Sequence, residues 1–238
     1  MADIQRSRKP ASRLTTILDT LRRRGSPAAV AGMARYGIRP AMPLGVSIPL
    51  LRRLAREIGT DHRLALRLWR SGVHEARILA SFVADPEAMT ESAMERWVGE
   101  IDSWDLCDQC CGTVFLSSPM AYRKCRKWSR DKREYVKRAG FALMARLAVH
   151  DKSAADVVFR RMFPLIVRGA RDERNFVRKA VNWALRQIGK RNENLNEAAA
   201  KIARGLSVAK DPSARWVGRD ALRELTGSAV RARWRESR

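Results

Sequence analysis

The chain of 238 residues carries 48 lysines and arginines against 25 aspartates and glutamates, a formal net charge of +23. Self-repulsion on this scale costs stability unless a polyanion screens it, and nucleic acid is the obvious polyanion. No run reaches the roughly 18 apolar residues of a membrane-spanning helix, and neither end carries a secretory signal or a lipidation motif. We therefore expect a soluble protein that is cytoplasmic and associated with the nucleoid.

Helical signals dominate along the chain. Residues 50–58, 74–83 and 94–101 have helical apolar spacing, and a stripe spaced by three and four residues runs from Phe176 to Ile188. Turn signals separate short helices at residues 25–27, 59–61, 85–86 and 211–213. No comparable strand alternation occurs, so the sequence predicts an all-α protein.

Three segments repeat one pattern in the C-terminal half. Tyr-Val-Lys-Arg-Ala from Tyr135 recurs as Phe-Val-Arg-Lys-Ala from Phe176, and more weakly as Trp-Val-Gly-Arg-Asp-Ala from Trp216, with starts 41 and 40 residues apart. A period near 40 with an aromatic residue and a basic pair is typical of HEAT-like pairs of antiparallel helices, each of which buries its apolar stripe against the next. We expect a right-handed solenoid of such pairs with a concave basic face.

The repeat is expected to form a single domain over residues 14–226. Residues 1–13 are expected to be a basic flexible tail, and residues 227–238 a basic C-terminal tail. The segment 123–133 is more basic than a link between helices requires, and it is interpreted either as a DNA-binding loop or as a mobile surface.

Lysines and arginines recur beside the apolar stripes, and equivalent pairs are expected to stack along one side of the solenoid. Such a row would follow a phosphate backbone, and binding would depend strongly on salt through counterion release. A solvated helix face is the ordinary explanation of any one pair, but the surplus of 48 basic over 25 acidic residues favours nucleic-acid contact. The residues concerned are Arg35, Arg39, Arg52, Arg53, Lys137, Arg138, Arg178, Lys179 and Arg186.

Four cysteines, at positions 107, 110, 111 and 125, crowd one region of the chain. They form no paired Cys-x-x-Cys motifs, and no nearby histidine completes a tetrahedral site. We expect buried free thiols, with neither a metal site nor a cofactor.

One short segment offers residues for chemistry. If residues 104–108 are helical, a spacing of four places the indole of Trp104 and the carboxylate of Asp108 on one face. Asp105 either shares that face or caps the start of the helix, where a carboxylate suits the helix dipole. On spacing alone, a core tryptophan and a surface or capping aspartate are the favoured interpretation.

Four motifs then occur in a recognisable order. They are Met-Ala-Arg-Tyr at 33–36, Gly-Val-Ser-Ile-Pro-Leu-Leu-Arg at 45–52, Ser-Trp-Asp-Leu-Cys-Asp at 103–108 and Ala-Val-Asn-Trp-Ala-Leu-Arg at 180–186. In order and approximate spacing they resemble the AlkD-like DNA alkylation repair family of HEAT-repeat glycosylases. The repeat pattern extends the resemblance to about residue 225.

The resemblance implies a monofunctional DNA glycosylase, a hydrolase of base excision repair that releases cationic N3- or N7-alkylated purines from duplex DNA without deep base flipping. Trp104, Asp108 and Trp183 would line its cleft, and Tyr36 and Arg138 would contact DNA. The residue types suit this chemistry, because a carboxylate near the sugar stabilises an oxocarbenium-like state and holds the attacking water, while indole faces favour a cation. The protein is expected to act as a monomer.

Two other functions stay open on the sequence. One is a HEAT-repeat protein that binds DNA structures without catalysis, since solenoids often serve as binding surfaces alone. Another is a scaffold for an acidic protein partner, which predicts weak DNA affinity even at low salt. Replacement of Asp108 separates the first from a glycosylase.

Overall fold

The computed structural model describes residues 10–235, and every regular element among them is a helix. The predicted all-α class is therefore confirmed. The chain divides into two compact units, Met1–Pro119 and Met120–Arg238, where the sequence predicts one repeat domain. Within the described residues, no helix is long and apolar enough to cross a membrane.

The helices of unit 1 include the three that the sequence locates upstream of the repeats. The segments predicted at 50–58, 74–83 and 94–101 correspond to α4, α6 and α7. Helix α2 begins at Pro10, inside the predicted N-terminal tail, and residues 1–9 lie outside the described residues. In chain order the helices are α2 (Pro10–Arg23), α3 (Pro27–Arg35), α4 (Ile48–Ile58), α5 (His62–Arg70), α6 (His74–Val83), α7 (Glu91–Glu100) and α8 (Trp104–Gly112).

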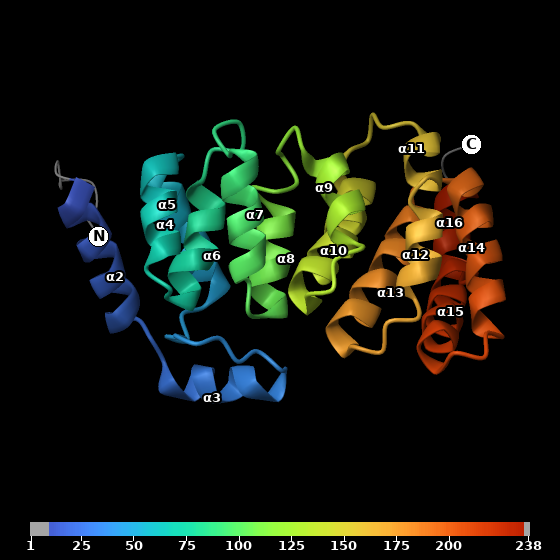
Figure 1. The fold of residues 1–238 in the computed structure, drawn as a ribbon, viewed down its shortest axis with the longest axis horizontal. Coiled ribbons are helices and arrows are strands. Elements are labelled where there is room, and N and C mark those ends of the chain that lie inside the picture. Colours follow the sequence, from blue (N-terminus) through green and yellow to red (C-terminus); the bar gives the residue numbers. More distant parts are fainter. Residues whose placement is uncertain (1–9, 236–238) are drawn as a thin grey trace. The chain divides into compact units, whose positions relative to one another are not determined.

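Alternate helices of unit 1 pack in series, α4 on α6 and α6 on α8, with α5 beside α6. Figure 1 shows α4 to α8 side by side and α3 lying across their ends. Buried Trp69 of α5 stacks on buried Trp97 of α7, with ring centroids 4.1 Å apart, and its indole N–H donates to Glu100 at 2.6 Å. This contact joins α5 and α7 through their largest apolar side chains.

Unit 2 continues with helices that reach into the predicted C-terminal tail. Helix α16 covers Ser228–Arg235, and residues 236–238 lie outside the described residues. The helices of this unit are α9 (Ala121–Trp128), α10 (Glu134–His150), α11 (Asp156–Arg160), α12 (Phe163–Gly169), α13 (Asn175–Gly189), α14 (Glu193–Ser207), α15 (Pro212–Leu225) and α16.

The repeat of about 40 residues corresponds to helix pairs in unit 2. Helix α9 packs on α10, α12 on α13 and α14 on α15, and the second helices of the pairs, α10, α13 and α15, pack on one another in series. Tyr135 and Phe176 occupy the first turns of α10 and α13, and Trp216 lies near the start of α15. Each repeated motif therefore marks the start of the second helix in a pair.

The first half of the basic segment 123–133 is not the predicted loop, because α9 covers Ala121–Trp128. The other interpretation of the segment, a mobile surface, stays a prediction. Ala121, Lys124, Cys125 and Trp128 are spaced by three and four residues and are all buried. This stripe stabilises a helix by packing on α10, while the remaining basic residues of α9 face outward. The expectation of a loop here was wrong because a lysine stands in the buried stripe.

A glycine lets α10 approach the end of α9 closely. A Cβ at Gly140 would lie 2.3 Å from the backbone nitrogen of Ser129, which cannot give way as a side chain would. We expect Gly140→Ala to lower the free energy of unfolding by about 1–3 kcal/mol through overpacking. Urea titration measures this, and Gly205→Ala, where a Cβ meets nothing within 4 Å, should instead leave stability unchanged or raise it by up to about 1 kcal/mol.

Candidate functional site

Helix α8 separates a buried side from a side that reaches solvent. Leu106, Cys107, Cys110 and Cys111 form its buried stripe. Trp104 and Asp108 are only partly buried and lie one turn apart, four residues in sequence. The predicted helix and the shared face of this pair are therefore present in unit 1.

Asp105 lies in the first turn of α8, where one of its two interpretations has it and where a carboxylate suits the helix dipole, but it also binds a residue of another helix. The position that caps α8 is Ser103, and the carboxylate of Asp105 turns to His74 of α6, with its Oδ2 2.9 Å from Nε2. Burial alone would lower the pKa of His74. The hydrogen bond and charge of Asp105, together with the charges of Glu75 and Asp102, outweigh burial and raise that pKa. Burial alone would raise the pKa of Asp105, but the hydrogen bond and charge of His74 outweigh it, and the pKa is lowered. Asp105 is thus the partner of His74 inside unit 1, whereas Asp108 lies on the partly exposed face of α8 with Trp104.

The His74–Asp105 pair predicts a stability profile with pH. A raised histidine pKa stabilises the fold below its ordinary value of 6.5, and this stabilisation is lost as the pH rises through the folded pKa. A lowered aspartate pKa stabilises the fold above its ordinary value of 3.8, and this is lost as the pH falls through the folded pKa. Urea unfolding from pH 5 to 9 should show stability falling above pH 6.5, and His74→Gln should flatten that fall. Equal slopes in both proteins would contradict the assignment.

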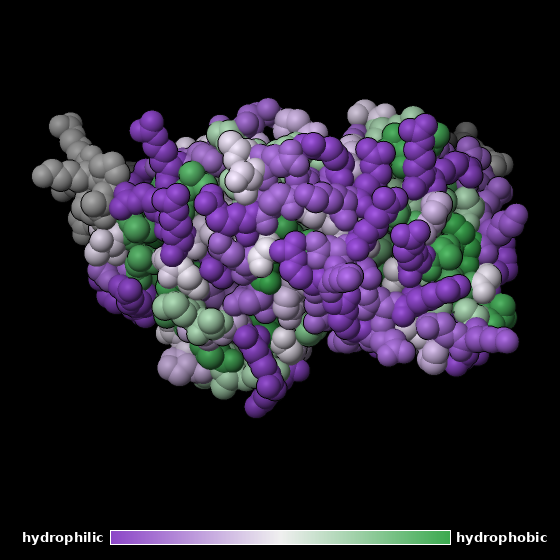
Figure 2. All heavy atoms as spheres, in the orientation of Figure 1, coloured by the Kyte–Doolittle hydropathy of each residue, from purple (hydrophilic) through white to green (hydrophobic). Residues whose placement is uncertain are grey.

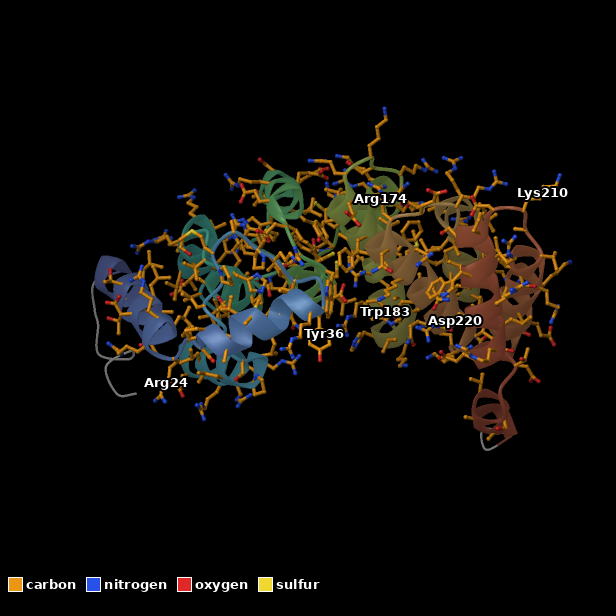
Figure 3. All side chains as sticks on the ribbon, turned by 90° about the horizontal axis from the view of Figure 1, so that it is seen from below. Arg24, Tyr36, Arg174, Trp183, Lys210 and Asp220 are labelled. Atoms are coloured by element: carbon orange, nitrogen blue, oxygen red, sulfur yellow. The ribbon has the colours of Figure 1, made fainter. Side chains whose placement is uncertain are left out.

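The indole of Trp104 is held by the chain that follows α3. Its Nε1 donates to the backbone carbonyl of Tyr36 at 2.9 Å, and the Tyr36 side chain itself is 72% exposed. Figure 3 shows Tyr36 at the end of α3. The hydrogen bond fixes the orientation of the indole ring, so one face of Trp104 is presented in a constant direction.

A buried carboxylate fastens the loop between α3 and α4, residues 36–47. Glu75 of α6 is 2% exposed and accepts hydrogen bonds from the amides of Leu44, Gly45 and Val46, the shortest at 2.6 Å from Gly45. Gly45 has a φ of +78°, which favours glycine, and a Cβ there would meet a backbone oxygen at 2.3 Å. Glu75 thereby anchors the loop that carries the carbonyl partner of Trp104, and sequence reasoning missed it because no local motif marks a buried carboxylate.

Trp183 lies on α13 in unit 2, where it is partly buried. With its amide oxygen facing the two donors, Gln187 accepts from Trp183 Nε1 and from Lys190 Nζ, at 3.2 Å each. The guanidinium of Arg146, from α10, lies 5.0 Å from the centre of the Trp183 ring. In residues 10–235, Arg146 forms no ion pair, so its charge stays available beside the indole. The joint cleft of Trp183 with Trp104 and Asp108 stays a prediction.

The basic residues singled out from the sequence occupy different environments. Figure 2 shows hydrophilic residues over most of the visible face of each unit. Arg35, Arg52 and Lys179 are exposed. Lys137 is bound to Asp172 at 2.9 Å, and Arg186 forms an ion pair with Glu224.

Arg138 is placed differently from the prediction that it contacts DNA. It is only 5% exposed, and its guanidinium donates to the carbonyl of Phe176 at 2.6 Å. A buried guanidinium that binds the neighbouring helix cannot reach a phosphate without leaving its site, so we remove Arg138 from the proposed interface. The physical reason is that a basic residue in the repeat motif serves the packing of α10 on α13.

The four cysteines are buried, and none of them forms a disulfide within the described residues. Burial raises the pKa of Cys110 and Cys111 well above the ordinary range, and that of Cys125 to about 12. Protonated thiols are poor nucleophiles and poor metal ligands, so these side chains act as apolar core groups. Across the described part of the chain, no three His, Cys, Asp or Glu side chains gather as a metal site would require.

Comparison with known proteins places these features in context. A sequence model for the DNA alkylation repair enzyme family matches residues 17–225. A search of curated protein sequences gives no match. One similar solved structure, with a TM-score of 0.73 and 20% identity over 87% of this chain and 93% of that chain, represents a new family of proteins related to the HEAT-like repeat DNA glycosylases with affinity for branched DNA structures. The similarity confirms the HEAT-like helical fold, whereas the right-handed stacking and the concave basic face stay predictions.

Proposed function

Because the chain belongs to the DNA alkylation repair enzyme family, we propose that it is a monofunctional DNA glycosylase for cationic N3- and N7-alkylated purines in duplex DNA. The observation that carries this proposal is the position of Asp108 on α8, where it lies one turn from Trp104 on a partly exposed face. Asp105 is bound to His74, while Asp108 shares the outer face with an indole whose N–H is already held. We propose that the enzyme acts as a monomer in base excision repair, in the cytoplasm at the nucleoid.

The proposed reaction replaces the alkylated purine by water at the sugar. The bond between C1′ and the purine nitrogen breaks, and its electron pair neutralises the positive charge of the leaving base. Asp108 stabilises the oxocarbenium-like sugar, and it accepts the proton as water adds to C1′. The products are the neutral alkylpurine and an abasic site, and no amine nucleophile is needed.

In this proposal, two tryptophans stabilise the cation and a nearby arginine contacts the DNA backbone. Trp104 and Trp183 offer electron-rich faces to the cationic base or sugar, and both have fixed N–H groups. Arg146 beside Trp183 joins the exposed basic residues as a phosphate contact. Approach from the sugar and backbone side would leave the lesion stacked, so the cost of extruding a base is avoided.

The test is base release from defined lesions. Wild-type protein is incubated with duplexes that carry 7-methylguanine or 3-methyladenine, which are cationic, or 1,N6-ethenoadenine, which is neutral, and the free bases are quantified by chromatography. We expect release of the cationic bases only, with the abasic strand left uncleaved. Release of the neutral base at a similar rate would contradict a mechanism that depends on the charge of the leaving group.

A second candidate function is recognition of DNA structure without catalysis. It is favoured by the similarity to the solved protein described as having affinity for branched DNA. In that case no base is released from any lesion, while a four-way junction is bound more tightly than a linear duplex at equal salt. The two measurements together separate the candidates.

A further inference from the structure

The repeated aromatic positions of unit 2 form a series whose last member stays exposed. Tyr135 of α10 stacks on Phe176 of α13, with ring centroids 6.0 Å apart and an interplanar angle of 26°. The equivalent residue of the next repeat, Trp216 on α15, is 37% exposed and stacks on no other aromatic ring among the described residues. Terminal repeats normally present a polar outer face to solvent. An exposed tryptophan at position 216 does not serve that purpose, so stability does not explain it.

An arginine supports the exposed indole. The guanidinium of Arg178, from α13, lies 4.7 Å from the centre of the Trp216 ring. Arg178 forms no ion pair within residues 10–235, and its buried Nε has no hydrogen-bond partner there. The ring is thus held by a cation whose charge no carboxylate neutralises.

The acidic groups of the same two helices are already engaged. Asp220 is paired with Arg223, and Glu224 is paired with Arg186 and Lys190. Figure 3 labels Asp220 on α15 and Trp183 on the neighbouring α13. The exposed side chains next in sequence to Arg178 and one turn from Trp216 are Lys179 and Arg219. A ligand at Trp216 therefore meets positive charge, which suits an anionic strand.

We propose that Trp216 and Arg178 form a second DNA-binding site, which stacks a nucleobase of an unpaired strand. Exposed tryptophans in positive surroundings bind single strands in this way, because every base has a flat face and every linker has a phosphate. Inside a duplex the base faces are covered by their neighbours, so only an unpaired or terminal base can offer one to the indole. The site recognises the single-stranded part of a damaged or branched substrate and adds to the proposed activity on duplex DNA.

The experiment compares two probes with the full chain. One is a blunt duplex, and the other is the same duplex with a single-stranded thymidine tail, both fluorescently labelled for anisotropy. Trp216→Ala should weaken binding of the tailed probe about 10-fold, the effect of losing one stacked base. It should leave binding of the blunt probe almost unchanged, because only the terminal base pairs of that probe expose a face. Trp216→Phe should keep most of the affinity, since it retains a ring face. Val208→Ala, at a residue 81% exposed in the same unit, is the control and should change neither probe.

Further readouts make the result decisive. Trp216→Leu keeps apolar bulk without a ring face and should lose as much affinity for the tailed probe as Trp216→Ala, at an unchanged melting temperature. Equal losses on both probes, or no loss on the tailed probe, would overturn the stacking site. Release of 7-methylguanine from a blunt duplex should be the same in Trp216→Ala and wild type, so failure of this site and failure of the proposed glycosylase are recorded by different assays.

Discussion

Replacement of Asp108 by asparagine is expected to lower the rate of 7-methylguanine release at least about 100-fold, the typical cost of removing one group that stabilises transition-state charge. The carboxylate lies one turn from Trp104 on the outer face of α8, where it can approach a sugar bound against that face. Asparagine keeps the size of the side chain but removes the negative charge and the proton acceptor. Single-turnover base release at saturating protein measures the rate, and anisotropy on an undamaged duplex should show affinity equal to or slightly above that of the wild type.

A second aspartate on the same helix provides the contrast. Asp105→Asn makes the same change of charge three residues earlier, but it removes the partner of His74. We expect it to lower the free energy of unfolding and to retain most of the base release per folded molecule. If Asp108→Asn releases base within threefold of the wild-type rate, or if Asp105→Asn is the variant that loses the reaction, the assignment of the carboxylate is wrong.

Helical class and repeat period could be predicted from sequence because both depend on local spacing. The stripe that begins at Phe176 fixes α13, and its counterparts at Tyr135 and Trp216 fix the starts of equivalent helices. Segment 123–133 was harder, because Lys124 interrupts the apolar pattern of α9 and yet is fully buried. A long side chain can bury its methylene stem, and sequence spacing does not reveal where its amino group goes.

The candidate site was predictable only in part, for the same reason. The shared face of Trp104 and Asp108 follows from a spacing of four within one helix. The partners of its neighbours come from distant segments: His74 lies 31 residues from Asp105, and Tyr36 lies 68 residues from Trp104. Such pairings depend on how the helices pack, so the sequence could place Asp105 at the start of α8 but could not reveal its bond to His74.

The binding surface shows that a count of positive residues overstates the charge available to DNA. Within one repeat motif, Arg138 is buried against the carbonyl of Phe176 and Lys137 is bound to Asp172. Burial alone would raise the pKa of Asp172. The hydrogen bonds from Arg174 and Lys137 outweigh it and lower this pKa to about 2, so the carboxylate is ionised at neutral pH. Counterion release depends on charges that neutralise phosphates, and a lysine already paired with a carboxylate contributes less than a free one.

The affinity for DNA is accordingly expected to fall about 1,000-fold or more between 50 and 200 mM salt, the behaviour of a protein that contacts six or more phosphates.

Two lysines of unit 2 are expected to contribute differently to this salt dependence, because one is exposed and the other is paired with a carboxylate. Lys179 is exposed and forms no ion pair among residues 10–235, so Lys179→Gln should reduce the slope of log affinity against log salt by about one. Lys137→Gln is the matched control and should change the slope less, because the charge of Lys137 is offset by Asp172. Anisotropy titrations at four salt concentrations measure both slopes. Equal changes of slope in the two variants would mean that the ion pair between Lys137 and Asp172 opens on binding. A shallow slope in the wild type would instead favour a scaffold that binds an acidic protein partner.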